Sequence, residues 1–144
     1  MDSEYVTYTT REIIEVQLRK SIRFYIDQLD YLTALSLAGA AEEILGAILR
    51  NSGEKPSIQK KFESFKTVEE SIWGKPALTK KEYIDSKNNT RNYLKHDSKH
   101  ESITFNPELE SRKMIGRALE NYRNLYGNDF ELRNEFVDEW KKKF

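Results

Sequence analysis

Apolar residues recur at steps of three or four along much of the chain, the spacing of an amphipathic helix. The first such segment begins near Thr9 and Thr10 and continues to about residue 29, and a second covers residues 31–50 and ends before Gly53. We therefore predict two amphipathic helices. Their core stripes are Ile14, Leu18, Ile22, Tyr25 and Leu29 in the first, and Ala34, Leu37, Ala41, Ile44 and Ile48 in the second.

Helix-start and helix-stop residues predict four further helices. Starts are marked by Pro56 with Ser57, by the capping-box spacing of Thr79 and Glu82, and by Asn106 with Pro107; stops are marked by Gly74 and Gly127. The residues expected to face inward are Ile58, Phe62, Phe65, Val68 and Ile72 in the third helix, Ile115, Ala118, Tyr122 and Leu125 in the fifth, and Phe130, Phe136, Val137, Trp140 and Phe144 in the sixth. The fourth helix has a thin core face.

No segment alternates in the Val/Ile/Thr-rich manner of a strand. We predict an all-α fold, an up-and-down bundle of five to six helices in a single domain over residues 1–144. A chain of 144 residues, 38% of them hydrophobic, suffices for one core. The N-terminus lacks the features of a signal peptide, and no stretch approaches the roughly 18 apolar residues of a membrane span, so a soluble, cytoplasmic protein without membrane contact is expected.

The amino-acid composition excludes several kinds of functional site. The chain has no cysteine and two histidines, so neither a disulfide framework nor a zinc site is expected, and we predict no metal and no cofactor. No segment resembles a Gly-rich phosphate loop, a Ser/His/Asp set or a two-carboxylate metal site. ATPase, protease and metallonuclease functions therefore have no support.

The net charge of zero conceals an uneven distribution. Lys and Arg number 24, as do Asp and Glu, but residues 55–100 hold eleven basic and six acidic side chains. Residues 1–54 hold five basic and nine acidic side chains, and residues 101–144 hold eight and nine. Any attraction to nucleic acid must therefore be focused on the middle third, and should weaken with added salt.

That middle third contains the most informative segment, KNNTRNYLKHD at residues 87–97. It contains several weak helix formers that fill no core. Asn92 and His96 are i,i+4 neighbours on a helix, with Asn88 and Lys95 beside them. Arg91 lies about 140° around an ideal helix from His96, so the two side chains converge more easily from two chains than within one.

The sequence from Arg91 to His96 resembles the signature of HEPN domains, an Arg followed by a polar residue, three others and a His. The ALSLAGAAEEILG segment is similar to the second helix of small stand-alone bacterial HEPN-like proteins. The resemblance covers roughly residues 10–127. It implies a helical bundle that forms two-fold dimers with paired motif helices, and in active members a metal-independent cleavage of RNA. Ser98 stands where some toxins with nucleotidyltransferase partners have a modified Tyr, so that modification is not predicted.

The resemblance implies an endoribonuclease, of the toxin or defence-effector kind, with a composite site in a homodimer. His96 would transfer protons, Arg91 would stabilise the charge on phosphorus, and Asn92 would position the imidazole of His96 or the phosphate. The residues expected to attract RNA are Lys95, Lys87, Asn88 and Lys99. An antitoxin or nucleotidyltransferase is a possible further partner.

Alternatives remain open at this point. The same polar face could belong to a non-catalytic module that binds a nucleotide, nucleic acid or protein, or to a structural dimer without a site. Glu42 or Glu43 could orient Arg91 or His96, although an exposed carboxylate is the commoner arrangement. We expect Trp73 and Trp140 in the core rather than stacked on bases, and His100 at the surface.

Overall fold

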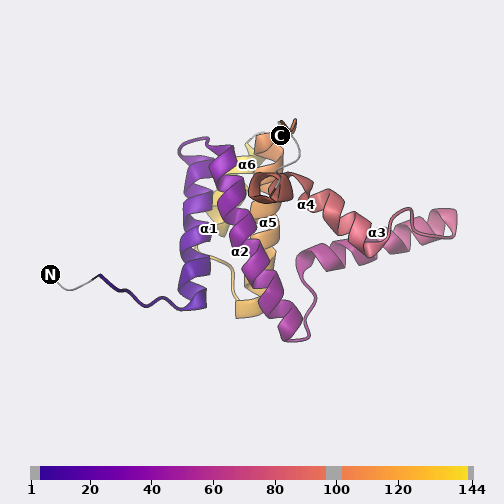
Figure 1. The fold of residues 1–144 in the computed structure, drawn as a ribbon, viewed down its shortest axis with the longest axis horizontal. Helices are drawn as coiled ribbons and strands as arrows, with labels where there is room; N and C mark the ends of the chain where they lie inside the picture. Colours follow the sequence, from indigo (N-terminus) through magenta and orange to yellow (C-terminus); the bar gives the residue numbers. More distant parts are fainter. Residues whose placement is uncertain (1–3, 97–101, 143–144) are drawn as a thin grey trace.

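The computed structural model describes residues 4–96 and 102–142, which form six α-helices and no strand (Figure 1). The all-α prediction is therefore confirmed. The helices are α1 (Thr10–Ile26), α2 (Tyr31–Asn51), α3 (Ser57–Trp73), α4 (Lys80–His96), α5 (Pro107–Tyr126) and α6 (Arg133–Lys141).

The predicted helix starts and stops have the expected local chemistry. Thr9 and Glu12 form a reciprocal capping box at α1, and Thr79 forms the same pair of hydrogen bonds with Glu82 at α4. The Asn106 side chain accepts from the backbone of the first turn of α5, and Gly127 ends that helix in the left-handed region at φ 81°. Short-range capping thus fixes these boundaries before any tertiary contact is considered.

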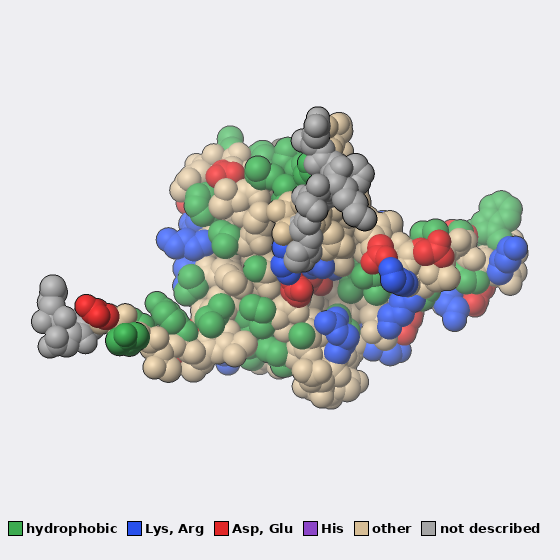
Figure 2. Space-filling model, in the orientation of Figure 1, with side chains coloured by type: hydrophobic (Ala, Val, Ile, Leu, Met, Phe, Trp, Pro, Cys, Tyr) green, Lys and Arg blue, Asp and Glu red, His purple; other side chains and the backbone are tan. Residues whose placement is uncertain are grey.

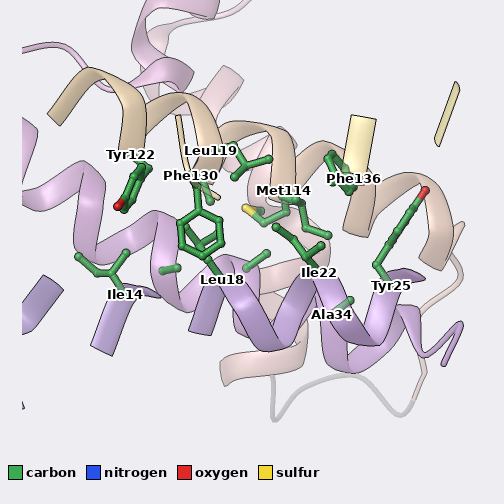
Figure 3. Close-up of a cluster of buried hydrophobic side chains, with 14 of the residues drawn as sticks. Ile14, Leu18, Ile22, Tyr25, Ala34, Met114, Leu119, Tyr122, Phe130 and Phe136 are labelled. Atoms are coloured by element: carbon green, nitrogen blue, oxygen red, sulfur yellow. The ribbon is translucent and has the colours of Figure 1, made fainter. Parts of the chain in front are cut away.

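The body of the protein is built on α1, α2 and α5, with α6 against one end (Figure 1). Ile14, Leu18, Ile22 and Tyr25 of α1 are fully buried, as their spacing predicts, and they meet side chains from α2 and α5 (Figure 3). Leu29 is different: it follows the end of α1 and is 60% exposed. Trp140 of α6 packs against this core, as expected; Phe144 lies outside the described residues.

A helical hairpin projects from the body, with α3 leading outward and α4 returning (Figure 1). Near the body, Ile58 and Phe62 of α3 pack on Tyr83 of α4 in a small second core. Farther out the stripe has no cover, and Val68, Ile72 and Trp73 are exposed. The predicted core position of Trp73 is therefore wrong, because none of the other described elements packs against the distal end of the hairpin.

By length and composition, α2 could cross a membrane, contrary to the sequence-based expectation that no segment approaches this limit. Its hydropathy comes from Leu, Ile and Ala, and Glu42 with Glu43 interrupts the apolar sequence, so no unbroken run of about 18 apolar residues is present. Half of the relevant window is buried against the rest of the body, mainly α1 and α5. That burial is the environment of the core helix of a soluble protein.

Candidate functional site

The side chain of Arg91 extends from α4 over Gly39 of α2. The C-terminal half of α4 lies on α2, where Gly39 and Glu42 are three residues apart and share a helix face. A Cβ at Gly39 would lie 2.7 Å from Cδ of Arg91 and 3.0 Å from its Cγ. Because glycine has no side chain, the aliphatic part of Arg91 can pass over Gly39 and place the guanidinium next to Glu42.

Glu42 is buried and binds two guanidinium groups. Its Oε2 lies 2.5 Å from Nη1 of Arg91, and its Oε1 accepts from Nη2 of Arg117 at 2.9 Å. Nη1 of Arg117 donates to Oδ1 of Asn88 at 2.8 Å. One carboxylate from α2 thereby connects the motif helix α4 to α5, and we call these four residues the Glu42 network.

The Glu42 network carries an excess of positive charge, since two guanidinium groups share a single carboxylate. Desolvation lowers the pKa of Arg117, and nearby Arg91 adds to this effect, while Glu42 opposes it. The Nε atoms of Arg91 and Arg117 are buried and have no hydrogen-bond partner among the described residues. Because these Nε atoms are enclosed by protein, the net positive charge of the network acts on a nearby anion through its electric field and not through a hydrogen bond from Nε.

A pocket of about 260 Å³ opens beside Arg91, between α2 and α4. Gly39, Ala40 and Leu94 supply its apolar lining, and Arg91 and Lys95 supply cations. Lys95 forms an ion pair with the exposed Glu43 at the rim. Arg91 uses Nη1 to bind Glu42, and its Nη2 forms no hydrogen bond to another described residue. The motif arginine is thus oriented by the protein and adjoins a ligand-sized opening.

The predicted site residues separate into two environments. Arg91 and Lys95 line the pocket just described, and Asn92 is exposed on the same stretch of α4. Lys87 is exposed but lines a different pocket, between α3, α4 and α5. Asn88 is 7% exposed and is occupied by Arg117, so the accessible position expected for an RNA-binding residue is not observed. The His96 side chain and Lys99 lie outside the described residues, as does His100.

Sequence reasoning missed the depth at which Glu42 lies and missed Arg117 altogether. The expectation of an exposed carboxylate is wrong for Glu42, which is 4% exposed, and correct for Glu43. The available signal was the position of Arg117 within the apolar face of α5, beside Ile115 and Ala118. An arginine there requires a buried acidic partner, and Glu42 in the apolar helix α2 was a suitable one.

Within the described part of the chain, no group of three His, Asp or Glu side chains is arranged to hold a metal ion. Comparison of the chain with models of known protein families, with curated proteins and with solved structures found no match.

Proposed function

We propose that this protein is a metal-independent endoribonuclease of the HEPN type, with a composite active site formed by two copies of α4 in a homodimer. The observation that carries the proposal is the placement of Arg91. Its guanidinium is held by Glu42 at the edge of a pocket, five residues before His96 in the same helix. An arginine held in a fixed orientation can bind a phosphate without first losing side-chain entropy.

The residue types suit cleavage at a ribose 2′-hydroxyl. One histidine takes the hydroxyl proton, and a second protonates the leaving 5′ oxygen, which is why the reaction needs His96 from both chains. Arg91 stabilises the charge that develops on phosphorus, using the donors that Glu42 leaves free. Asn92 positions the phosphate or the imidazole, and Lys95 adds electrostatic attraction at the rim.

The surface next to Arg91 suits a second copy of the chain. The pocket beside Arg91 and a shallower one of about 500 Å³ share Ala40, Glu43 and Lys95, so a continuous depression follows α2. Small side chains along this helix allow close approach of another helix. In Figure 2 the body is largely hydrophobic or uncharged in this view, whereas charged side chains gather on the α3–α4 hairpin. A two-fold contact over α2 would bring the two copies of Arg91 together.

The proposal is tested by cleavage of labelled single-stranded RNA in excess EDTA, with analysis of the product ends. We expect a 2′,3′-cyclic phosphate and a 5′-hydroxyl. His96→Ala and Arg91→Ala should each lower the rate by at least about 100-fold. Arg123→Ala removes an exposed arginine of α5 and should leave the rate unchanged. An intact wild-type dimer that leaves RNA uncut would overturn the enzymatic proposal.

A non-catalytic binding module is the second candidate, favoured by the limited exposure of Arg91, whose side chain is 13% accessible. In this case Glu42 and Arg91 would serve binding and stability alone. This candidate predicts that His96→Ala retains full affinity for RNA, nucleotide or protein, and that no cyclic phosphate forms. Specific loss of a cyclic-phosphate product in His96→Ala would exclude it.

A further inference from the structure

A second, larger pocket lies between the α3–α4 hairpin and the body. Its volume is about 470 Å³, within the range of small-molecule sites. Three helices each contribute one lysine to its wall: Lys61 from α3, Lys87 from α4 and Lys113 from α5. These residues are 26 positions apart in sequence, so their convergence comes from the fold and not from a local run of lysines.

Four cationic side chains line this pocket, against one carboxylate. None of the three lysines forms an ion pair with another described residue, whereas three other lysines of the same region do: Lys55 with Glu63, Lys66 with Glu70 and Lys81 with Asp85. Glu110 contributes a carboxylate to the lining. Partial desolvation lowers the pKa of Lys61; the carboxylates of Glu120 and Glu42 oppose this shift, and the charges of Arg117 and Lys87 act in the same direction as desolvation.

Arg117 forms the inner wall, and it connects this pocket to the Glu42 network. Arg117 is 4% exposed, and no residue in the part of the chain that the structure describes forms a hydrogen bond with its Nε. Because it shares Glu42 with Arg91, its charge is only partly balanced from within the protein. The three lysines therefore surround a buried guanidinium that itself lacks a full counter-charge.

We propose that this pocket binds phosphate groups, supplied either by a free nucleotide or by the backbone of a nucleic-acid strand. Lysines provide mobile point charges for phosphate oxygens, and the buried guanidinium provides a fixed positive wall. Ile58, Tyr83 and Met114 give the pocket an apolar side where the remainder of a phosphate ester packs. The inference does not depend on RNA cleavage at Arg91 and His96.

The test compares two triple variants of equal charge. Lys61→Gln, Lys87→Gln and Lys113→Gln alter the pocket, whereas Lys60→Gln, Lys66→Gln and Lys75→Gln alter exposed lysines that do not line it. Binding of pyrophosphate, of ATP and of a fluorescent 12-nucleotide RNA is measured at several salt concentrations. We expect the pocket variant to lose at least tenfold in affinity and the control variant to stay within about twofold. For RNA, the dependence of log K on log salt should become shallower by up to about two.

Comparison of the binding of pyrophosphate, ATP and RNA identifies the source of the phosphate. Binding of pyrophosphate and ATP, without competition from RNA, assigns a free nucleotide; competition by RNA assigns a nucleic-acid strand. The proposal is overturned when none of the three ligands binds, or when both triple variants lose affinity equally. None of these readouts involves RNA cleavage, so failure here is distinct from failure of the proposed endoribonuclease.

A measurement on the unaltered protein guards against misfolding of the variant. Lysine acylation is followed by mass spectrometry with and without pyrophosphate, and with and without the RNA. Protection should be confined to Lys61, Lys87 and Lys113, whereas the three control lysines should react equally in all samples. Uniform labelling under every condition would contradict the proposal.

Discussion

Replacement of Glu42 by glutamine is the most informative perturbation of this structure. Gln has the same shape but no charge, so the variant leaves two guanidinium groups without their shared carboxylate. The Arg91 side chain is 13% exposed and adjoins a pocket, so water can compensate part of its loss; the Arg117 side chain is only 5% exposed. Removing one partner of a buried ion pair costs about 3–5 kcal/mol, and we expect Glu42→Gln to fall in this range.

The assay is urea denaturation followed by far-UV circular dichroism. In a thermal melt followed by the same signal, a loss of about 3–5 kcal/mol corresponds to a fall in Tm of about 12–20 °C, at about 4 °C per kcal/mol for a domain of this length. Glu43→Gln is the matched control, since it removes the adjacent carboxylate of the same helix. That residue pairs with Lys95 through side chains that are 49% and 45% exposed, so its loss should cost less than about 1 kcal/mol.

A double variant separates electrostatics from packing. Arg117→Met removes the more deeply buried guanidinium, so Glu42→Gln should cost much less in that background than in the wild type. We expect a coupling free energy of at least about 1.5 kcal/mol between the two positions. Additive effects, or a cost below about 1 kcal/mol for Glu42→Gln alone, would show that the Glu42 network does not hold α2, α4 and α5 together.

Two further predictions concern space and exposure. Gly39→Ala places a Cβ 2.7 Å from Cδ of Arg91, so it should displace that side chain and destabilise the protein by about 1–3 kcal/mol despite the better helix propensity of alanine. The control Gly46→Ala, whose Cβ meets no atom closer than 3.4 Å, should be neutral or stabilising by up to about 1 kcal/mol. Equal effects of the two substitutions in urea denaturation would contradict the argument. Trp73→Ala should change the free energy of unfolding by less than about 0.5 kcal/mol, because the side chain is 72% exposed; a larger loss by the same measurement would mean that the end of α3 is covered in solution.

The elements of this fold follow closely from local sequence, because their signals are local. Thr9, Thr79 and Asn106 satisfy backbone donors within their own first turns, and Gly127 adopts a positive φ that other residues resist. The burial of a helix face is a different matter. Periodicity states that α3 has an apolar side, but only the tertiary arrangement decides how far along that side a neighbour extends, which is why Trp73 is exposed.

The candidate site was predictable for Arg91 and Lys95, whose pattern lies within one helix, and not for the residues that position them. Glu42 and Arg117 are 75 positions apart, and the sequence around either residue contains no motif that predicts the other as its partner. Asn88 is a second example: helical spacing predicts that it lies near the exposed polar face, but its side-chain amide is buried because it accepts a hydrogen bond from Arg117 of α5. Buried ionic networks depend on pairings between helices, which a periodic pattern in one helix does not contain.

The two pockets give the charge imbalance of the sequence a structural meaning. Lys61, Lys87 and Arg91 all come from the basic segment 55–100, yet they do not form one surface: α4 separates the opening beside Arg91 from the lysine pocket. Glu42, from the acidic first segment, lies between the two openings through its contacts with Arg91 and Arg117. A phosphate that binds Arg117 would weaken its hold on Glu42 and strengthen the pairing of Glu42 with Arg91. If the lysine pocket binds phosphate as proposed, its occupation should therefore tighten the orientation of Arg91 and couple the two openings through Glu42.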